Sequence, residues 1–136
     1  HMDEQTYLFE GVVNLLEELE AKGIKMATVT NKGSRGVHHA YVKFDIGKYF
    51  AVSIAADDVL KGKPDPEGIF AALNKLGAEP GEALFVGDSL NDIIAAKGAY
   101  VKSVLVGWTF FSEDHYTEFG ADYVIKKPAD LMGLLV

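Results

Sequence analysis

Apolar and polar positions along this chain follow two periods, which alternate from one segment to the next. Short apolar runs bounded by turn residues are typical of buried strands, and apolar residues every three or four positions are typical of helices. The strand pattern occurs in five runs, at 24–30, 52–55, 83–86, 102–106 and 122–125. The helical period occurs at 11–22, 34–43, 66–76, 90–97, 113–119 and 128–135. Strands that alternate with helices predict a parallel sheet covered by helices on both faces.

Glycine and proline mark the ends of several of these segments. Gly23 follows the first helical period and is expected to close it as a C-cap, and Gly77 closes the third. Asp65 and Pro66 precede that third period, as expected for an N-cap and the first helical residue. The chain shows no internal repeat, linker or low-complexity tract. We therefore expect residues 3–136 to form one domain, with His1 and Met2 as a cloning remnant.

Composition and charge exclude several classes of function. The 136 residues carry a formal charge of −7 with a sequence pI of about 5.0, so a nucleic-acid backbone would be repelled. No apolar run approaches the ~20 residues of a membrane span, so no membrane partner is expected. The chain has no cysteine, which removes disulfides, thiolate metal sites and thiol catalysis and favours a cytoplasmic location.

Two carboxylates follow the third expected strand where the chain turns into a helix. The strand ends at Gly87 and Asp88, and Asp92 follows four positions later. Open α/β folds bind ligands at the carboxyl ends of their strands, and oxygen ligands at such an edge suit Mg²⁺. A second interpretation needs no metal, because Ser89 can cap the helix with Asp92 as its capping-box partner. This segment alone leaves both interpretations open.

Two further polar positions lie after strands or in a turn. Thr30 ends the first strand and Asn31 leads toward a helix, so a hydroxyl and backbone N–H groups can face one phosphate oxygen. Alternatively, Thr30 or Ser34 merely caps that helix. Lys63 lies between a glycine and a proline, where its amine can neutralise a phosphate or stay in water at the surface. Together, hydroxyl, amine and carboxylate pair supply a Mg²⁺-assisted phosphoryl-transfer site except for its nucleophile.

With these residues the chain resembles the haloacid dehalogenase-like hydrolases, especially their phosphoglycolate phosphatase-like branch. Residues 29–32 are similar to the family's second motif, residues 62–66 to its third and residues 86–92 to its fourth. The resemblance extends from about residue 11 to the C-terminus. It implies an α/β fold, a Rossmann-like three-layer sandwich with a mostly parallel five-stranded sheet. It also implies Mg²⁺ as cofactor and a small phosphorylated metabolite as substrate.

The resemblance assigns a role to each candidate residue. Thr30 would hydrogen-bond the transferring phosphoryl group, and Lys63 would steady the negative charge on nucleophile and substrate. Thr30, Asn31 and Lys63 would bind phosphate, and Asp88 and Asp92 would hold the metal. The catalytic residues implied for this chain are thus Thr30, Lys63 and Asp88.

The family's first motif, an Asp-x-Asp pair on the central first strand, has no counterpart here. None of the ten aspartates lies two positions from another, and the substrate-selecting cap that follows that motif is also missing. In the family the first strand lies between the strands that end at Thr30 and Asp88. Without it, those two strands either pair directly or leave a slot of unpaired backbone groups. Residues 6–9 are poor candidates to fill a slot, because a helix follows them too closely.

These observations lead to an expectation and an alternative. We expect the core of a Mg²⁺-dependent phosphatase of this family, with little or no turnover as an isolated chain. If turnover appears, Asp57 and Asp58 are the first carboxylates to test as its source. The alternative is a non-catalytic binding or assembly module whose open sheet takes a partner strand or swaps one in a homo-oligomer. The aromatic residues near Trp108 are expected to serve packing rather than substrate stacking.

Overall fold

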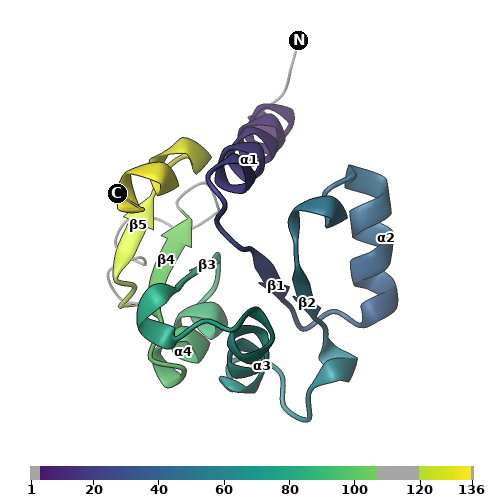
Figure 1. Cartoon of the computed structure of the whole chain (residues 1–136), viewed down its shortest axis with the longest axis vertical. Coiled ribbons are helices and arrows are strands. Elements are labelled where there is room, and N and C mark those ends of the chain that lie inside the picture. Colours follow the sequence, from purple (N-terminus) through teal and green to yellow (C-terminus); the bar gives the residue numbers. More distant parts are fainter. Residues whose placement is uncertain (1–3, 107–119, 136) are drawn as a thin grey trace.

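The structure, a computed structural model, describes residues 4–106 and 120–135 (Figure 1). The expected helix at 113–119 and the aromatic residues near Trp108 lie outside these residues. None of the helices in the described ranges is long and apolar enough to cross a membrane.

The helices and strands follow the predicted alternation. The α-helices are α1 (Glu4–Ala21), α2 (Ser34–Phe44), α3 (Glu67–Leu76) and α4 (Leu90–Gly98). The strands are β1 (Ala27–Val29), β2 (Val52–Ile54), β3 (Leu84–Gly87), β4 (Lys102–Val106) and β5 (Tyr123–Ile125). Short 3₁₀ helices are η1 (Gly47–Tyr49), η2 (Ala56–Asp58), η3 (Pro80–Glu82) and η4 (Pro128–Leu134). The last predicted helix is thus a 3₁₀ helix, and residues 6–9 belong to α1 rather than to a strand.

The residues predicted to begin and end helices lie largely where the sequence predicts them. Gly77 is the C-cap of α3 with a φ of 70°, and Gly23 just after α1 has a φ of 75°, both in the left-handed region that glycine adopts without strain. The start of α3 differs by one position from the prediction. Pro66 is its N-cap, and the Asp65 carboxylate accepts a hydrogen bond of 2.9 Å from the N–H of Glu67.

Every strand pairing is parallel, which confirms the Rossmann-like α/β class. β1 pairs with β2, and β3 pairs with β4, which pairs with β5. The five strands therefore form two separate sheets within the described residues, and β1 and β3 do not pair with each other. Figure 1 shows the two sheets side by side with β1 and β3 as the facing edges. Of the two arrangements left open by the sequence, the structure has the open slot between β1 and β3.

Helices cover both faces of the sheets, which produces the three layers. On one face of β1 and β2, Thr28 and Ser53 point toward Tyr41 of α2, whose hydroxyl hydrogen-bonds with both side chains. On the opposite face, Val29 and Ile54 lie against Gly68 of α3. The other sheet has α1 and η4 on one face and α3 and α4 on the other.

Burial differs between strands with one and two neighbours. Residues 103–106 of β4, which has strands on both sides, are all buried. The residues of β1 are only half-buried, and Val86 of β3 is 41% exposed. Central parallel strands are ordinarily covered on both faces and paired along both edges. β1 and β3 have the short apolar sequences of such strands, but each pairs with only one strand among the described residues.

Candidate active site

The carboxyl ends of β1 and β3 meet at the turn that contains Lys63. The Asn31 side chain donates from Nδ2 to the Lys63 carbonyl at 3.0 Å and accepts from the Lys63 backbone N–H at 2.9 Å. This pair of hydrogen bonds has the form of a strand pairing, with a side-chain amide in place of a peptide group. The close approach of the Asn31 side chain to this turn requires glycine at position 62, because a Cβ there would lie 2.5 Å from Asn31 Oδ1. Asn31 therefore ties the loop after β1 to the lysine turn.

The Lys63 amine reaches the other sheet. Its Nζ lies 2.5 Å from Oδ1 of Asp92, and the two side chains are only 14% and 7% exposed. The same amine lies 5.6 Å from the centre of the Phe85 ring, within the range of a cation–π contact. Lys63 thus links the Asn31 loop at the end of β1 to the start of α4 after β3.

Asp92 is the most highly connected side chain of the site. Its Oδ2 accepts from the Asp88 backbone N–H at 3.0 Å and from the Ser89 hydroxyl at 3.1 Å. Ser89 is the N-cap of α4, and its Oγ accepts from the Asp92 N–H at 3.3 Å. Ser89 is therefore confirmed as the N-cap, but the predicted capping box is not formed, because the Asp92 carboxylate accepts from the Asp88 N–H rather than from the Ser89 N–H. The Asp92 carboxylate is buried, and the lysine on its other oxygen compensates its charge.

Asp88 contrasts with Asp92, because its carboxylate is exposed. The carboxylate of Asp88 makes no hydrogen bond or ion pair with the residues that the structure describes, although its backbone N–H donates to Asp92. No group of three or more potential metal-binding side chains occurs in the described ranges. Mg²⁺ is commonly held by one or two carboxylates together with water and substrate phosphate, so this donor set fits it. Asp88 is free to bind a cation directly, and Asp92 lies beside it.

Thr30 lies at the end of β1 with its hydroxyl oriented by its own loop. Its Oγ1 accepts from the Lys32 backbone N–H at 3.1 Å, a local turn that lies before α2. The alternative interpretation is wrong, because the N-cap of α2 is Gly33 and neither Thr30 nor Ser34 caps this helix. Since the hydroxyl acts as an acceptor there, its own proton remains available for an anionic oxygen. The local hydrogen bond and a phosphate contact are therefore compatible.

The structure brings the five predicted residues to one edge of the two sheets, by contacts that link Asn31, Lys63, Asp92 and Asp88. Contact of Thr30, Asn31 and Lys63 with phosphate stays a prediction, and so does metal binding by Asp88 and Asp92. The sequence pattern does not predict the hydrogen bonds between Asn31 and the lysine turn, or the Phe85 ring next to the Lys63 amine. The only signals for them were the glycine before Lys63 and the aromatic residue inside a strand.

Asp57 and Asp58 have structural partners after β2. Asp57 accepts from the backbone N–H of Ser34 at 2.7 Å and from the Ser34 hydroxyl, so it supplies the missing cap of α2. Asp58 Oδ2 accepts from the Ala55 N–H at 2.7 Å. Both carboxylates therefore stabilise local structure, which makes them weak candidates for a substitute nucleophile.

The cap supplied by Asp57 predicts a dependence of stability on pH. The hydrogen bonds from Ser34 hold the pKa of the Asp57 carboxyl below its ordinary value of 3.8. A lowered folded-state pKa stabilises the fold above the unfolded-state pKa, and this contribution is lost as the pH falls through the folded-state value. We expect Asp57→Asn to melt below the wild type at about pH 7, with the difference shrinking below about pH 4. Thermal melts followed by circular dichroism test this. An equal difference at every pH would contradict the proposed cause.

Comparison with known proteins places the chain among hydrolases. A family model described as haloacid dehalogenase-like hydrolase matches residues 1–106. The pyrophosphatase PpaX of Halalkalibacterium halodurans is 36% identical over 135 residues, and that of Bacillus velezensis is 35% identical over 130 residues. These matches cover 99% and 96% of this chain but only 63% and 60% of the two relatives. The chain thus spans about three fifths of the length of these curated relatives.

Solved structures of related proteins also match nearly the whole of this chain but only part of their own length. A predicted phosphoglycolate phosphatase from Haemophilus somnus has a TM-score of 0.85 and 29% identity, covering 93% of this chain and 56% of its own. A HAD-superfamily hydrolase from Geobacter sulfurreducens has a TM-score of 0.80 and 28% identity, covering 93% of this chain and 55% of its own.

Proposed function

Because this chain belongs to the haloacid dehalogenase-like hydrolases, we propose that it is the phosphate- and metal-binding part of a Mg²⁺-dependent phosphatase. The proposed substrate is a small phosphorylated metabolite. The observation that carries this proposal is the contact of the Lys63 turn with both sheets, which gathers the hydroxyl, amine and carboxylates at one edge. The relatives named as pyrophosphatase and phosphoglycolate phosphatase support phosphate as the group recognised.

In this proposal each residue of the site has one task. Thr30 donates its hydroxyl proton to a phosphate oxygen, since its acceptor side is occupied by Lys32. Lys63 contributes positive charge next to the phosphate, held in place by Asp92 and Asn31. Asp88 and Asp92 would hold Mg²⁺, which supplies charge neutralisation for the phosphate when bound. The proposed place of this chemistry is the cytoplasm.

The isolated chain is proposed to bind these ligands with little or no turnover. Phosphoryl transfer through a covalent intermediate needs a carboxylate nucleophile aimed at phosphorus. The exposed Asp88 belongs to the proposed metal site, and Asp57 and Asp58 are occupied by hydrogen bonds. The described residues therefore include groups that bind phosphate and metal in this proposal, but none that is placed to attack phosphorus.

We expect Mg²⁺ to bind the chain and Asp88→Asn to weaken that binding at least about tenfold, because the exposed ligand loses its charge. Isothermal titration calorimetry measures the affinity. Asp45→Asn is the matched control, since Asp45 is an exposed aspartate away from the site with a φ of 54°, a conformation that asparagine tolerates. Equal Mg²⁺ affinity in the wild type and Asp88→Asn would refute the metal assignment.

The same preparations test the absence of turnover. With p-nitrophenyl phosphate and Mg²⁺, we expect hydrolysis no faster than in the protein-free reaction. Robust hydrolysis that disappears in Asp88→Asn would show that the isolated chain is an active enzyme. Asp57→Asn and Asp58→Asn would then identify which carboxylate acts.

A further inference from the structure

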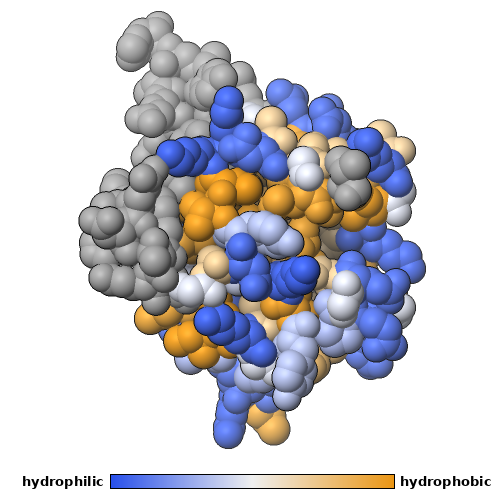
Figure 2. Space-filling model, turned by 90° about the vertical axis from the view of Figure 1, so that its left-hand side faces the viewer, coloured by the Kyte–Doolittle hydropathy of each residue, from blue (hydrophilic) through white to orange (hydrophobic). Residues whose placement is uncertain are grey.

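The turn between η2 and α3, which carries Lys63, is not held by apolar packing at its tip. Large hydrophobic side chains reach the surface of this chain at several places, and Figure 2 shows hydrophobic residues in the middle of one face. Among the described residues, Leu60 of this turn is the most exposed of the large hydrophobic ones, at 96%. Lys61 and Gly62 are exposed as well. Hydrogen bonds must therefore fix the backbone of this turn.

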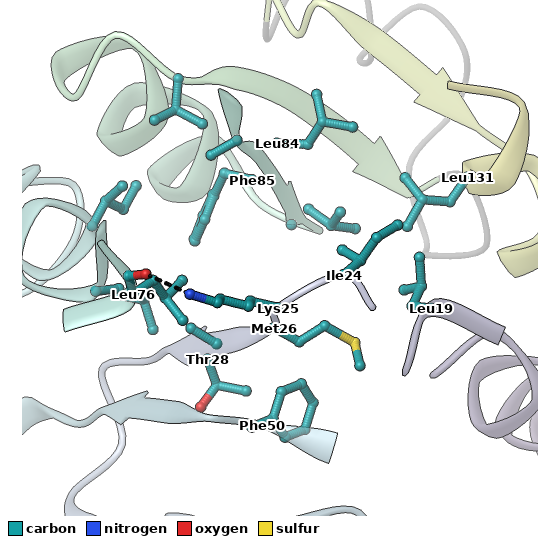
Figure 3. Close-up of a pocket in the computed structure, with 18 of the residues that line it drawn as sticks. Leu19, Ile24, Lys25, Met26, Thr28, Phe50, Leu76, Leu84, Phe85 and Leu131 are labelled. Atoms are coloured by element: carbon teal, nitrogen blue, oxygen red, sulfur yellow. Dashed lines mark hydrogen bonds between the residues drawn. The ribbon is translucent and has the colours of Figure 1, made fainter. Parts of the chain in front are cut away.

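Lys63 also borders a cavity. This space of about 720 Å³ lies between the two sheets, and Lys63 lines it together with Asp88 and Asp92 of the site. Lys25 is the other lysine that lines it among the described residues, but its amine donates to the Leu76 carbonyl at 3.3 Å, at the end of α3 (Figure 3). Because a cavity adjoins Lys63 on one side, packing alone does not fix its amine. The position of the amine therefore depends on the turn that carries it.

Glu67, the first residue of α3, accepts two backbone hydrogen bonds from this turn. Its Oε2 accepts from the Leu60 N–H at 2.8 Å, and its Oε1 accepts from the Lys61 N–H at 3.2 Å. Both oxygens of one carboxylate thus bind adjacent peptide groups, and hydrogen bonds to a charged acceptor are stronger than neutral ones. On its other side, the turn is held by Asn31, which pairs with the backbone of Lys63. The turn is therefore fixed both from α3 and from the loop after β1.

The residues on either side of Glu67 are packed closely. Gly68 is buried, and a Cβ on it would lie 2.8 Å from Cγ1 of Val29 in β1. Pro66 lies against the end of α4, where a Cβ on Gly98 would lie 3.1 Å from the Pro66 Cγ. The start of α3 thus rests on β1 and on α4, one from each side of the site. The carboxylate of Glu67 therefore has a fixed base from which to hold the turn.

We propose that Glu67 is a positioning residue of the site, which acts through Lys63. By fixing the backbone at Leu60 and Lys61, it sets the direction from which the Lys63 side chain enters the site. The inference rests on the proposed function, in which Lys63 contributes positive charge next to phosphate. Glu67 does not contact the phosphate itself, since both of its oxygens accept from the turn. Water can replace the carboxylate at these exposed N–H groups, so its loss should loosen the turn without unfolding the chain.

Two substitutions distinguish positioning from a purely structural role of Glu67. An acidic residue in the first turn of a helix also stabilises that helix through the macrodipole. Glu67→Asp keeps this charge, but its side chain is one methylene shorter and does not reach both N–H groups of the turn. Glu67→Gln removes the charge and keeps the length, with one acceptor oxygen for the turn. A dipole role predicts that the aspartate variant resembles the wild type, whereas positioning predicts that it binds phosphate more weakly than the glutamine variant.

Isothermal titration calorimetry of the full chain with inorganic phosphate, in the presence of Mg²⁺, tests the proposal. We expect Glu67→Asp to weaken phosphate binding at least about fivefold, and Glu18→Asp, at an exposed position of α1, to leave it unchanged. If Glu67 acts through Lys63, Glu67→Asp should cost nothing further in the Lys63→Met background. Additive losses in that double variant would overturn the proposal, and so would wild-type affinity in Glu67→Asp.

A measurement without phosphate separates this inference from the proposed function. In the ligand-free chain, Glu67→Asp should shift the NMR resonances of the Lys63 side chain and the Asp92 amide, because the amine bound to Asp92 moves with the turn. Unchanged resonances of both residues would overturn the positioning role. A wild type that binds no phosphate would refute the proposed function, and these resonances would then decide on Glu67 alone. They also decide if Lys63→Met does not fold, and Glu67→Gln replaces Glu67→Asp if circular dichroism shows that variant unfolded.

Discussion

Asp92→Ala is expected to lower the free energy of unfolding by about 3–5 kcal/mol, a large share of what a domain of this size has. The substitution leaves the Lys63 amine buried without its carboxylate partner, since the two side chains are 14% and 7% exposed. It also removes the acceptor for the Asp88 N–H and the Ser89 hydroxyl. Urea unfolding followed by circular dichroism measures the loss.

A double-mutant cycle separates the ion pair from the other contacts of Asp92. Lys63→Met in the Asp92→Ala background removes the unpaired buried charge, so the double variant should be more stable than additivity of the two single changes predicts. Asp88→Ala is the matched control. Its carboxylate is exposed and unpaired within the described residues, so its cost should stay within about 0.5 kcal/mol. Equal losses for Asp88→Ala and Asp92→Ala would contradict this division of roles.

Gly87→Ala is the second substitution with a large expected effect. A Cβ at this position would lie 2.6 Å from Cγ and 2.5 Å from Oδ2 of Asp92, so the carboxylate must move. Overpacking of this kind costs about 1–3 kcal/mol and more where neighbours cannot shift. We expect a loss in that range by urea unfolding, together with a changed amide resonance of Asp88, whose N–H donates to the displaced oxygen.

Gly81→Ala is the control for that substitution. Nothing lies within 4 Å of a Cβ placed on Gly81, so alanine should be neutral or stabilise the fold by up to about 1 kcal/mol. If both glycine variants lose the same stability, crowding against Asp92 is not the cause. Unchanged Asp88 amide resonances in a destabilised Gly87→Ala would point to the same conclusion.

The order of helices and strands could be predicted from the sequence because it depends on local periods. Gly77 has the left-handed backbone that its position after an apolar period suggested. The bounds of β1 could not be predicted, since Ile24 and Met26 are as apolar as the strand but lie outside its three paired residues. Whether β1 and β3 would close up depends on packing across the whole domain, which no local pattern encodes.

Some features of the candidate site could likewise be predicted from the sequence, and others could not. That Lys63, Asp88 and Asp92 share one edge follows from the rule that parallel strands end on the same side. The different environments of the two aspartates do not follow from their spacing. Asp92 is buried because it turns back onto the strand end and meets Lys63, whereas Asp88 points to solvent. Asn31 likewise reads as a free polar group in the sequence, yet its amide is held by the Lys63 backbone.

The chain of contacts from Asn31 through Lys63 to Asp92 joins the two sheets at their carboxyl ends only. These contacts are directional, so they set the distance between the sheets at that end. At the amino ends, Leu19, Ile24 and Leu131 meet through apolar packing, which has no preferred direction. The two sheets are therefore held by directional polar contacts at their carboxyl ends and mainly by apolar packing at their amino ends. We therefore expect any change in the separation of the sheets to be larger at their amino ends than at the site.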